Sequence, residues 1–221
     1  YVSEVEGLTE YEKEIKIHDK LAYSVTYSDL DELPRKYHTA EGTLIENIGV
    51  CDGFTKALQL IYDKAGIESI IVLGTLDGNP HAWNLVKIED NWYNVDITSS
   101  RSILSETGVI NHAYFNLTNQ KMKRIATFDN EELIPKTDST KYDFYEYNNY
   151  IINAEQDITQ QMRSIHSSFT DKSYMEFYFI GDVADNISNM LMALKRIDST
   201  FLDGTKMYYY NIENAIIIPR N

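Results

Sequence analysis

The chain has 221 residues, of which 43% are hydrophobic, enough to bury one large core or two smaller ones. Acidic side chains number 34 and basic ones 20, which gives a formal net charge of −14 at pH 7. Because such a surface repels phosphate backbones and anionic lipid, we expect a folded globular protein that has no nucleic-acid partner.

No apolar run approaches the roughly 18 to 20 residues that cross a bilayer, and residues 1–20 lack an apolar signal core, so we expect no membrane insertion. Because residue 1 is Tyr rather than Met, we expect a processed or trimmed product. We also expect an extracellular or cell-surface location, for which the sequence contains no targeting segment. Cys51 is the only cysteine, and the five histidines form no HxxxH pairing. We therefore expect no internal disulfide, no metal and no cofactor.

The first predicted elements lead up to this cysteine. Residues 9–24 carry apolar side chains at helical spacing, and Thr9 with Glu12 forms a capping box. A polar segment follows over residues 29–47. From Cys51 onward apolar residues again recur at helical intervals, and Gly66 is placed to cap the C-terminus. The sequence thus predicts a helix that begins at the only thiol.

The next stretch predicts an antiparallel three-stranded meander. Its strands are ESIIVLGTL, HAWNLVKIE and WYNVDIT, which are rich in β-branched and aromatic residues and are separated by DGNP and DN. Trp83 and Trp92 lie on these strands, and we assign them packing roles.

Turn-forming and charged residues over 129–141 predict a seam near Asp138, so we expect two domains, residues 1–137 and 138–221. In the second we expect a polar helix over about residues 152–169 and an amphipathic helix, DNISNMLMALKRID, capped near Asp185 or Asn186. The strands expected there are MEFYFIGD, KMYYYNI and AIIIPRN. The second domain is therefore predicted to be a small α/β unit.

Three residues follow one another along the chain as candidates for catalysis: Cys51 at a helix start, His81 at a strand start and Asp96 late in the next strand. A helix start favours a thiolate and offers free amides to an oxyanion, and Gly49 and Gly53 are expected to let a substrate backbone approach. The thiolate needs an imidazole, which needs a third group to fix its tautomer. Taken singly, Cys51 is more typical of an inert core thiol and His81 of a core histidine.

The register of the second hairpin decides whether His81 reaches Asp96. A loop over residues 88–91 pairs Lys87 with Trp92, sets His81 opposite Thr98, and leaves Asp96 on the diagonal, about 7 to 8 Å away. A two-residue turn over residues 90–91 separates the two side chains too far. A triad thus requires the longer loop or a bulge.

The blocks GVCDGFTKALQLIYDKAGI, HAWNLV and WYNVDIT resemble the transglutaminase-like superfamily, over roughly residues 9–125. The resemblance implies an α+β, cysteine-protease-like core in which the helix carrying the cysteine packs on an antiparallel sheet. It also implies a triad with Cys51 as nucleophile, His81 as general base and acid, and Asp96 as its orienter.

The implied activity is acyl transfer or hydrolysis of an amide or peptide bond through a thioester, on a protein or peptide substrate that could be attached to a cell wall. The triad does not decide between water and an amine as acceptor; the resemblance to bacterial members favours hydrolysis. Two departures, Asp52 after the cysteine and SSRS after Thr98, favour the alternative of an inactive binding or scaffolding module at the cell surface.

Overall fold

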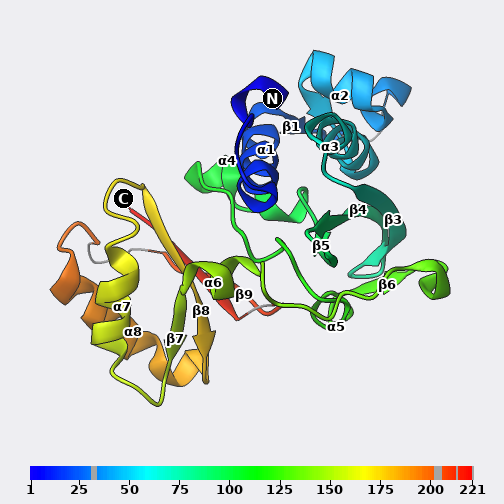
Figure 1. Cartoon of the computed structure of the whole chain (residues 1–221). Coiled ribbons are helices and arrows are strands. Elements are labelled where there is room, and N and C mark those ends of the chain that lie inside the picture. The colour runs from blue at the N-terminus through cyan, green and yellow to red at the C-terminus, as the bar shows by residue number, and fades with distance from the viewer. Residues whose placement is uncertain (31–33, 202–205, 213, 221) are drawn as a thin grey trace.

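The computed structural model describes residues 1–30, 34–201, 206–212 and 214–220. Two four-stranded sheets form its framework, each covered by helices (Figure 1). The first sheet is antiparallel and has the helix that begins at Cys51 packed on it, so the predicted α+β, transglutaminase-like fold class is confirmed.

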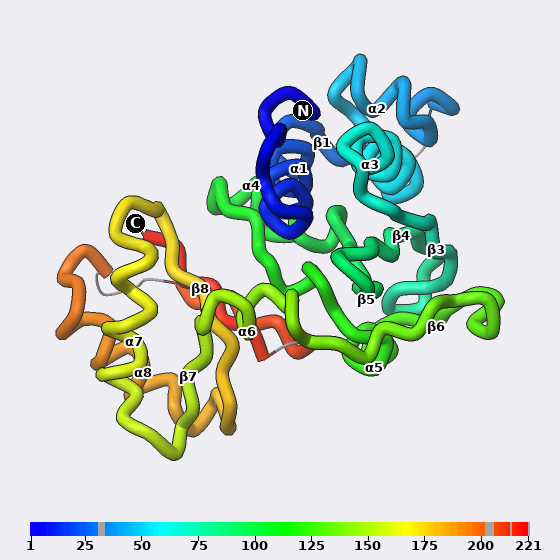
Figure 2. Tube along the Cα trace, in the orientation of Figure 1, coloured from blue at the N-terminus to red at the C-terminus, as the bar shows by residue number. Residues whose placement is uncertain are grey.

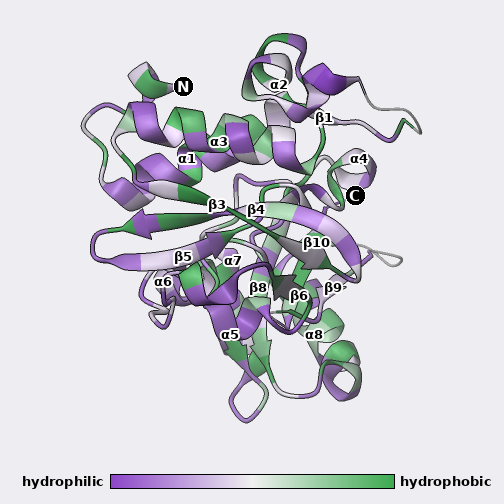
Figure 3. Cartoon of the chain, turned by 90° about the vertical axis from the view of Figure 1, so that its right-hand side faces the viewer, coloured by the Kyte–Doolittle hydropathy of each residue, from purple (hydrophilic) through white to green (hydrophobic). Residues whose placement is uncertain are grey.

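Two long helices cover the first sheet (Figure 3). Helix α1 (Glu10–Ser24) starts with the predicted capping box of Thr9 and Glu12, and helix α3 (Cys51–Ala65) ends at Gly66 in the left-handed conformation. Helix α3 packs against α1 and against the strands β3 and β4 below it. Its buried apolar face is the one that the helical spacing predicts.

Short elements join α1 to α3. They are β1 (Thr26–Tyr27), the 3-10 helix η2 (Arg35–His38), α2 (Ala40–Glu46) and β2 (Ile48–Gly49), and β1 pairs with β2 in parallel. Residues 31–33 of the predicted polar segment lie outside the described residues. A further 3-10 helix, η1 (Val2–Glu4), precedes α1.

The first sheet has the order β5-β4-β3-β6. The predicted meander is confirmed as β3 (Ser69–Leu76), β4 (Asn79–Ile88) and β5 (Asn91–Val95), and β6 (Ala126–Phe128) adds an edge strand that was not predicted. Lys87 pairs with Trp92, so the predicted register is confirmed. The loop is shorter than predicted because Ile88 and Asn91 also pair, and Glu89, with a φ of 53°, turns the chain.

An irregular connection runs from β5 to the second sheet (Figure 2). It holds four short helices: η3 (Ser99–Arg101), α4 (Leu104–Thr107), α5 (Asn119–Met122) and η4 (Glu131–Leu133).

The second sheet has the order β7-β8-β10-β9, with β7 and β8 parallel and the other neighbours antiparallel. Its strands are β7 (Ile151–Asn153), β8 (Tyr174–Ile180), β9 (Tyr208–Tyr210) and β10 (Ala215–Pro219), and its helices are α6 (Phe144–Asn148), α7 (Ile158–His166) and α8 (Val183–Ile197). Helices α7 and α8 lie side by side against one face of this sheet (Figure 1).

Three details of this second part differ from the sequence expectations. The helix predicted over residues 152–169 is shorter, because residues 151–153 form a strand and Asp157 caps the helix. Helix α8 starts earlier than predicted because Asp182 provides its N-cap. Residue 221, the end of the predicted last strand, lies outside the described residues. The boundary at Asp138 stays a prediction.

A cluster of polar side chains connects strand β8 of the second sheet with helix α1, which covers the first sheet. Glu176 on β8 accepts hydrogen bonds from the His112 ring at 2.6 Å, from the His112 backbone amide at 3.2 Å and from the Tyr145 hydroxyl at 3.2 Å. The other ring nitrogen of His112 donates to Asp19 on α1 at 3.2 Å, and Phe144 stacks on the ring at 3.9 Å. These contacts tie the second sheet to the first helix.

Candidate active site

Cys51 is the first residue of α3 and is half-buried. Thr55, one turn later, fixes this end of the helix against the sheet: its hydroxyl is shared between the Cys51 carbonyl at 2.6 Å and the Ala82 carbonyl at 3.2 Å. Asn84 donates to the Thr55 carbonyl at 3.1 Å. The helix end is therefore held against strand β4 beside His81.

His81 lies on β4, and Asp96 follows the last residue of β5. The Nε2 atom of His81 donates to Asp96 Oδ2 at 2.8 Å, so the register brings these two side chains into direct contact. Asp96 Oδ1 accepts from the Thr98 hydroxyl at 2.8 Å and from the Thr98 and Ser99 amides at 3.1 Å each. The Ser99 hydroxyl donates to Oδ2 at 2.5 Å. Asp96 is thus a fully buried carboxylate held by donors on both oxygens.

The charges around His81 keep it protonated at neutral pH. Burial lowers the pKa of His81, but hydrogen bonds with Asp96 and Cys51 and the charges of both outweigh burial, and the pKa rises to about 10. Burial alone raises the pKa of Asp96, but the hydrogen bond and charge of His81, with the Ser99 donors, hold it below its usual range. Because Nε2 is engaged by Asp96, Nδ1 is the nitrogen left for Cys51.

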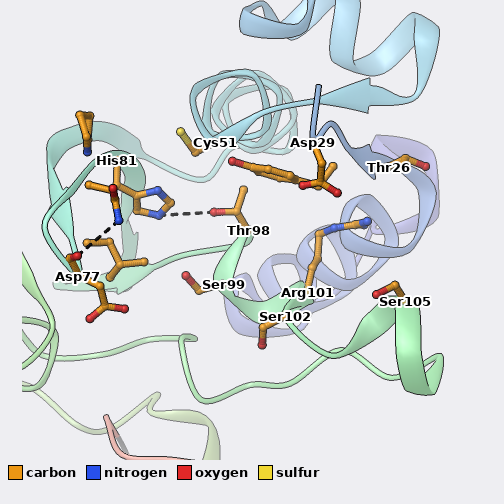
Figure 4. Close-up of a pocket in the computed structure, with 14 residues that line it drawn as sticks. Thr26, Asp29, Cys51, Asp77, His81, Thr98, Ser99, Arg101, Ser102 and Ser105 are labelled. Carbon is orange, nitrogen blue, oxygen red and sulfur yellow. Dashed lines mark hydrogen bonds between the residues drawn. The ribbon is translucent and has the colours of Figure 1, made fainter. Parts of the chain in front are cut away.

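A pocket of about 580 Å³ opens over these residues (Figure 4). Cys51 and His81 line it, together with Thr98, Ser99 and Arg101 from the segment after Asp96. Tyr27, the last residue of β1, and Asp29, two residues later, form another part of its wall. The structure therefore brings the three predicted side chains together and gives the thiol and the imidazole access to a cavity.

The glycines beside Cys51 do not have the role that we expected. A Cβ atom on Gly53 would lie 2.1 Å from the Tyr37 carbonyl oxygen, and one on Gly49 would lie 2.6 Å from the Thr43 hydroxyl. The space over both glycines is therefore filled by this chain's own segment before α3, and not left for a substrate backbone. The prediction of substrate approach at these two glycines is wrong.

The carboxylate of Asp52, the first departure from the family pattern, is bonded to two groups other than the thiol. It accepts from His38 Nδ1 at 2.8 Å and from Lys56 Nζ at 2.9 Å. Lys56 also donates to the His38 carbonyl at 2.7 Å. Since two partners share the Asp52 charge, this residue is a weaker argument for an inactive site than the sequence alone indicated.

Tyr27 is a site residue that the sequence reading did not identify. Burial raises the pKa of its hydroxyl, and hydrogen bonding from the Cys51 backbone amide partly offsets that rise. A helix N-terminal amide and a hydroxyl next to the sulfur are the kind of donors that stabilise an oxyanion. No sequence signal marks Tyr27, because it lies 24 residues before the cysteine on a two-residue strand.

Arg101 is the second residue that was missed. The SSRS segment was recognised as a departure, but its arginine was not assigned a function. The guanidinium lines the pocket, and its Nε and Nη1 atoms are buried with no hydrogen-bond partner among the described residues.

One group of potential metal ligands occurs in the part of the chain that the structure describes. Ligand atoms of His18, Asp19 and His112 lie within 4.8 Å of one another. Burial lowers the pKa of His112, but the charges of Glu176 and Asp19 outweigh burial and raise it to about 10. A ring protonated on both nitrogens donates to the two carboxylates and has no lone pair for a cation. The group therefore fits an ion-paired network, and the absence of a metal stays a prediction.

The family model described as the transglutaminase-like superfamily matches residues 2–97, a region that ends just after Asp96. This part of the chain is similar to the transglutaminase-like superfamily. The matched region contains the thiol, the imidazole and the carboxylate described above. No helix among the described residues has the length and apolar character to span a bilayer.

Two solved structures resemble parts of this chain. A structure described as a putative cysteine protease from Cytophaga hutchinsonii is 24% identical, with a TM-score of 0.36, over 40% of this chain and 31% of that one. A structure described as a TGase is 15% identical, with a TM-score of 0.34, over 66% of this chain and 40% of that one. The matched region thus spans less than half the length of each of these two solved structures. No curated protein matches the chain.

Proposed function

We propose that this chain is a cysteine-dependent enzyme that cleaves amide or peptide bonds through a thioester on Cys51, with His81 as general acid and base and Asp96 as the group that orients it. The observation that carries this proposal is that His81 hydrogen-bonds with the buried Asp96 and lines the same open pocket as Cys51. An extracellular or cell-surface peptide or protein substrate is part of the proposal.

In the proposed mechanism, Cys51 Sγ attacks the substrate carbonyl carbon and the carbonyl oxygen becomes an oxyanion. The Cys51 amide and the Tyr27 hydroxyl are the candidate donors to that oxygen. The protonated Nδ1 of His81 gives its proton to the leaving amine as the carbon–nitrogen bond breaks, leaving a thioester. His81 then takes a proton from water, which attacks the thioester, releases the acid and returns the thiol.

The first test measures the rate at which iodoacetamide alkylates Cys51 across pH, in the parent and in His81→Ala. A cation beside a thiol favours the reactive thiolate, and His81 stays charged through neutral pH. We expect His81→Ala to slow alkylation at about pH 6 by at least about tenfold, and to reduce turnover by about 10²- to 10⁴-fold. Asp96 keeps its Thr98 and Ser99 donors in this variant, so we expect it to stay folded, which circular dichroism checks.

Peptide and glutamine-containing substrates, with and without a fluorescent primary amine, then show by mass spectrometry whether water or an amine takes the acyl group. Cys51→Ala is the matched control. A folded parent whose alkylation rate is the same as that of His81→Ala, and which forms no thioester, overturns the enzyme proposal in favour of a binding module.

A further inference from the structure

Arg101 is a half-buried cation without an anionic partner among the described residues, and it lines the same pocket as the thiol. It is the last residue of η3, five positions after Asp96. Its Nε and Nη1 atoms are buried and bond to nothing among the described residues. Burial lowers the pKa of Arg101 to about 10, and no neighbouring carboxylate raises it again.

The two buried donor atoms of Arg101 lack a partner although the chain has 14 more acidic than basic side chains. Buried charges are normally paired, because a charge removed from water without a partner costs several kcal/mol. The contact that Arg101 does make is with the Phe54 ring, whose centroid lies 5.2 Å from its Cζ atom. An aromatic face supports a guanidinium and leaves the edge with its N–H donors free for another group.

Phe54 also places Arg101 relative to the sulfur. It lies three residues after Cys51 on α3, which corresponds to about 4.5 Å along the helix axis. Cys51, His81 and Arg101 line one cavity of about 580 Å³, and Figure 4 shows them around the same opening. A group bound by Arg101 is therefore within one or two residues of a carbonyl held at Cys51.

We propose that Arg101 binds a carboxylate of the acyl donor next to the bond that Cys51 attacks, so that the substrates of this site are acidic peptides or peptides cleaved close to a free C-terminus. This inference rests on the proposed function and names the substrate class of that site. A carboxylate matches the two parallel donors of a guanidinium and would supply the partner that the folded chain lacks.

Two carboxylates of the chain itself also line the pocket, and they do not fill this role. Asp29 and Asp77 form no ion pair with Arg101 within the described residues, and neither charge contributes to the Arg101 pKa. Around the guanidinium the same pocket presents hydroxyl groups, those of Ser102 and Ser105. These neutral donors can add to the binding of an anion without competing for it.

The decisive experiment compares two alkylating reagents of similar size on the intact chain. In each, the Cys51 sulfur displaces iodide and forms a thioether, but iodoacetate carries a carboxylate where iodoacetamide carries a neutral amide. The measured quantity is the ratio of the two rate constants, relative to the ratio for free cysteine. We expect Arg101→Gln to lower this ratio about tenfold, and Arg101→Lys to lower it less.

Arg163→Gln is the matched control, because it removes the same charge from an exposed position on α7. It should keep the parent ratio. If Cys51 is alkylated in a His81-dependent manner and Arg101→Gln leaves the ratio unchanged, the nucleophile stands and the carboxylate inference fails. If alkylation does not depend on His81, the proposed function fails, and that outcome is distinct from the first.

A second measurement does not need a reactive thiol and separates the two sources of a carboxylate. Calorimetry on Cys51→Ser compares acetyl-Ala-Glu amide with acetyl-Ala-Gln amide, and acetyl-Ala-Ala acid with its amide. Tighter binding of the Glu peptide indicates a side-chain carboxylate, and tighter binding of the free acid indicates a C-terminal one. Either preference should disappear in Cys51→Ser with Arg101→Gln. The absence of both preferences overturns the inference.

Discussion

Among the histidine–carboxylate pairs of the described residues, His81–Asp96 and His112–Glu176 differ in their surroundings. His81 bonds Asp96 at 2.8 Å, and His112 bonds Glu176 at 2.6 Å; the pKa of each imidazole rises to about 10. The other ring nitrogen of His81 is left for Cys51, and both residues line an open pocket. The other ring nitrogen of His112 bonds a second carboxylate, Asp19.

The difference shows that a charged histidine pair does not by itself make an active site. The His112 ring is buried: Phe144 stacks on it, and a carboxylate bonds each of its nitrogens. Its proton is therefore held between fixed partners and does not reach a substrate. His81 has the same charge but a thiol and a cavity beside it. The first pair is suited to proton transfer, and the second to holding β8 against α1.

The comparison is tested most strongly by Glu176→Gln, which removes one charge from the buried His112–Glu176 pair, called here the closed pair. Because Glu176 is fully buried and accepts three hydrogen bonds, we expect the free energy of unfolding to fall by about 3 to 5 kcal/mol. Urea unfolding measures this loss. The alkylation rate of Cys51 in the folded variant should remain that of the parent. A stable variant with slowed alkylation would mean that the closed pair acts on the site.

A smaller effect is the decline of stability at alkaline pH. The pKa values of His81 and His112 are raised on folding, so their stabilisation is complete below about pH 6.5 and is lost as pH rises through about 10. Burial also raises the pKa of Glu14 to about 8, so folding favours its protonated form and the chain loses stability as pH rises from about 4.5 through 8.

All three groups therefore act in the same direction. Urea unfolding should give a lower free energy at about pH 9.5 than at about pH 6. The decline should be smaller in His112→Gln, which lacks one of the titrating groups. A stability that stays level over this range would show that neither pair holds its proton as the geometry indicates.

The smallest effect concerns Arg101, for which the described part of the chain supplies no ion-pair partner. Replacement of Arg101 by Met removes a buried guanidinium without orphaning any partner, so we expect the variant to be more stable by about 1 kcal/mol. Thermal unfolding at fixed pH measures the gain, with Arg163→Met as the control. A loss of stability in Arg101→Met would indicate a structural partner for the guanidinium.

The sequence predicted the part of the site that depends on local pattern. The helix start at Cys51, the meander and the pairing of Lys87 with Trp92 follow from spacing and turn residues, and they bring His81 to Asp96. Tyr27 and Arg101 could not be assigned in this way. They reach the pocket through a two-residue strand and an irregular connection, whose paths depend on packing across the whole chain.

The closed pair was missed for a similar reason. His112 and Glu176 are separated by 64 residues and lie on an irregular segment and a strand of the second sheet. No periodicity joins them, and a buried glutamate inside a hydrophobic strand reads as a solvent-facing residue. The second sheet itself was largely predicted, because its strands and helices show clear apolar patterns.

The crowding at Gly53 bears on how related sequences should be read as they diverge. A side chain there would strike the Tyr37 carbonyl whether or not the protein has any chemistry. A descendant that lost its enzymatic role would still be under pressure to keep this glycine, but would be free to replace Cys51 and Arg101. Under the proposed function, the glycine in a family tree therefore traces the inheritance of the fold, and the thiol with its neighbouring guanidinium traces the inheritance of the proposed activity.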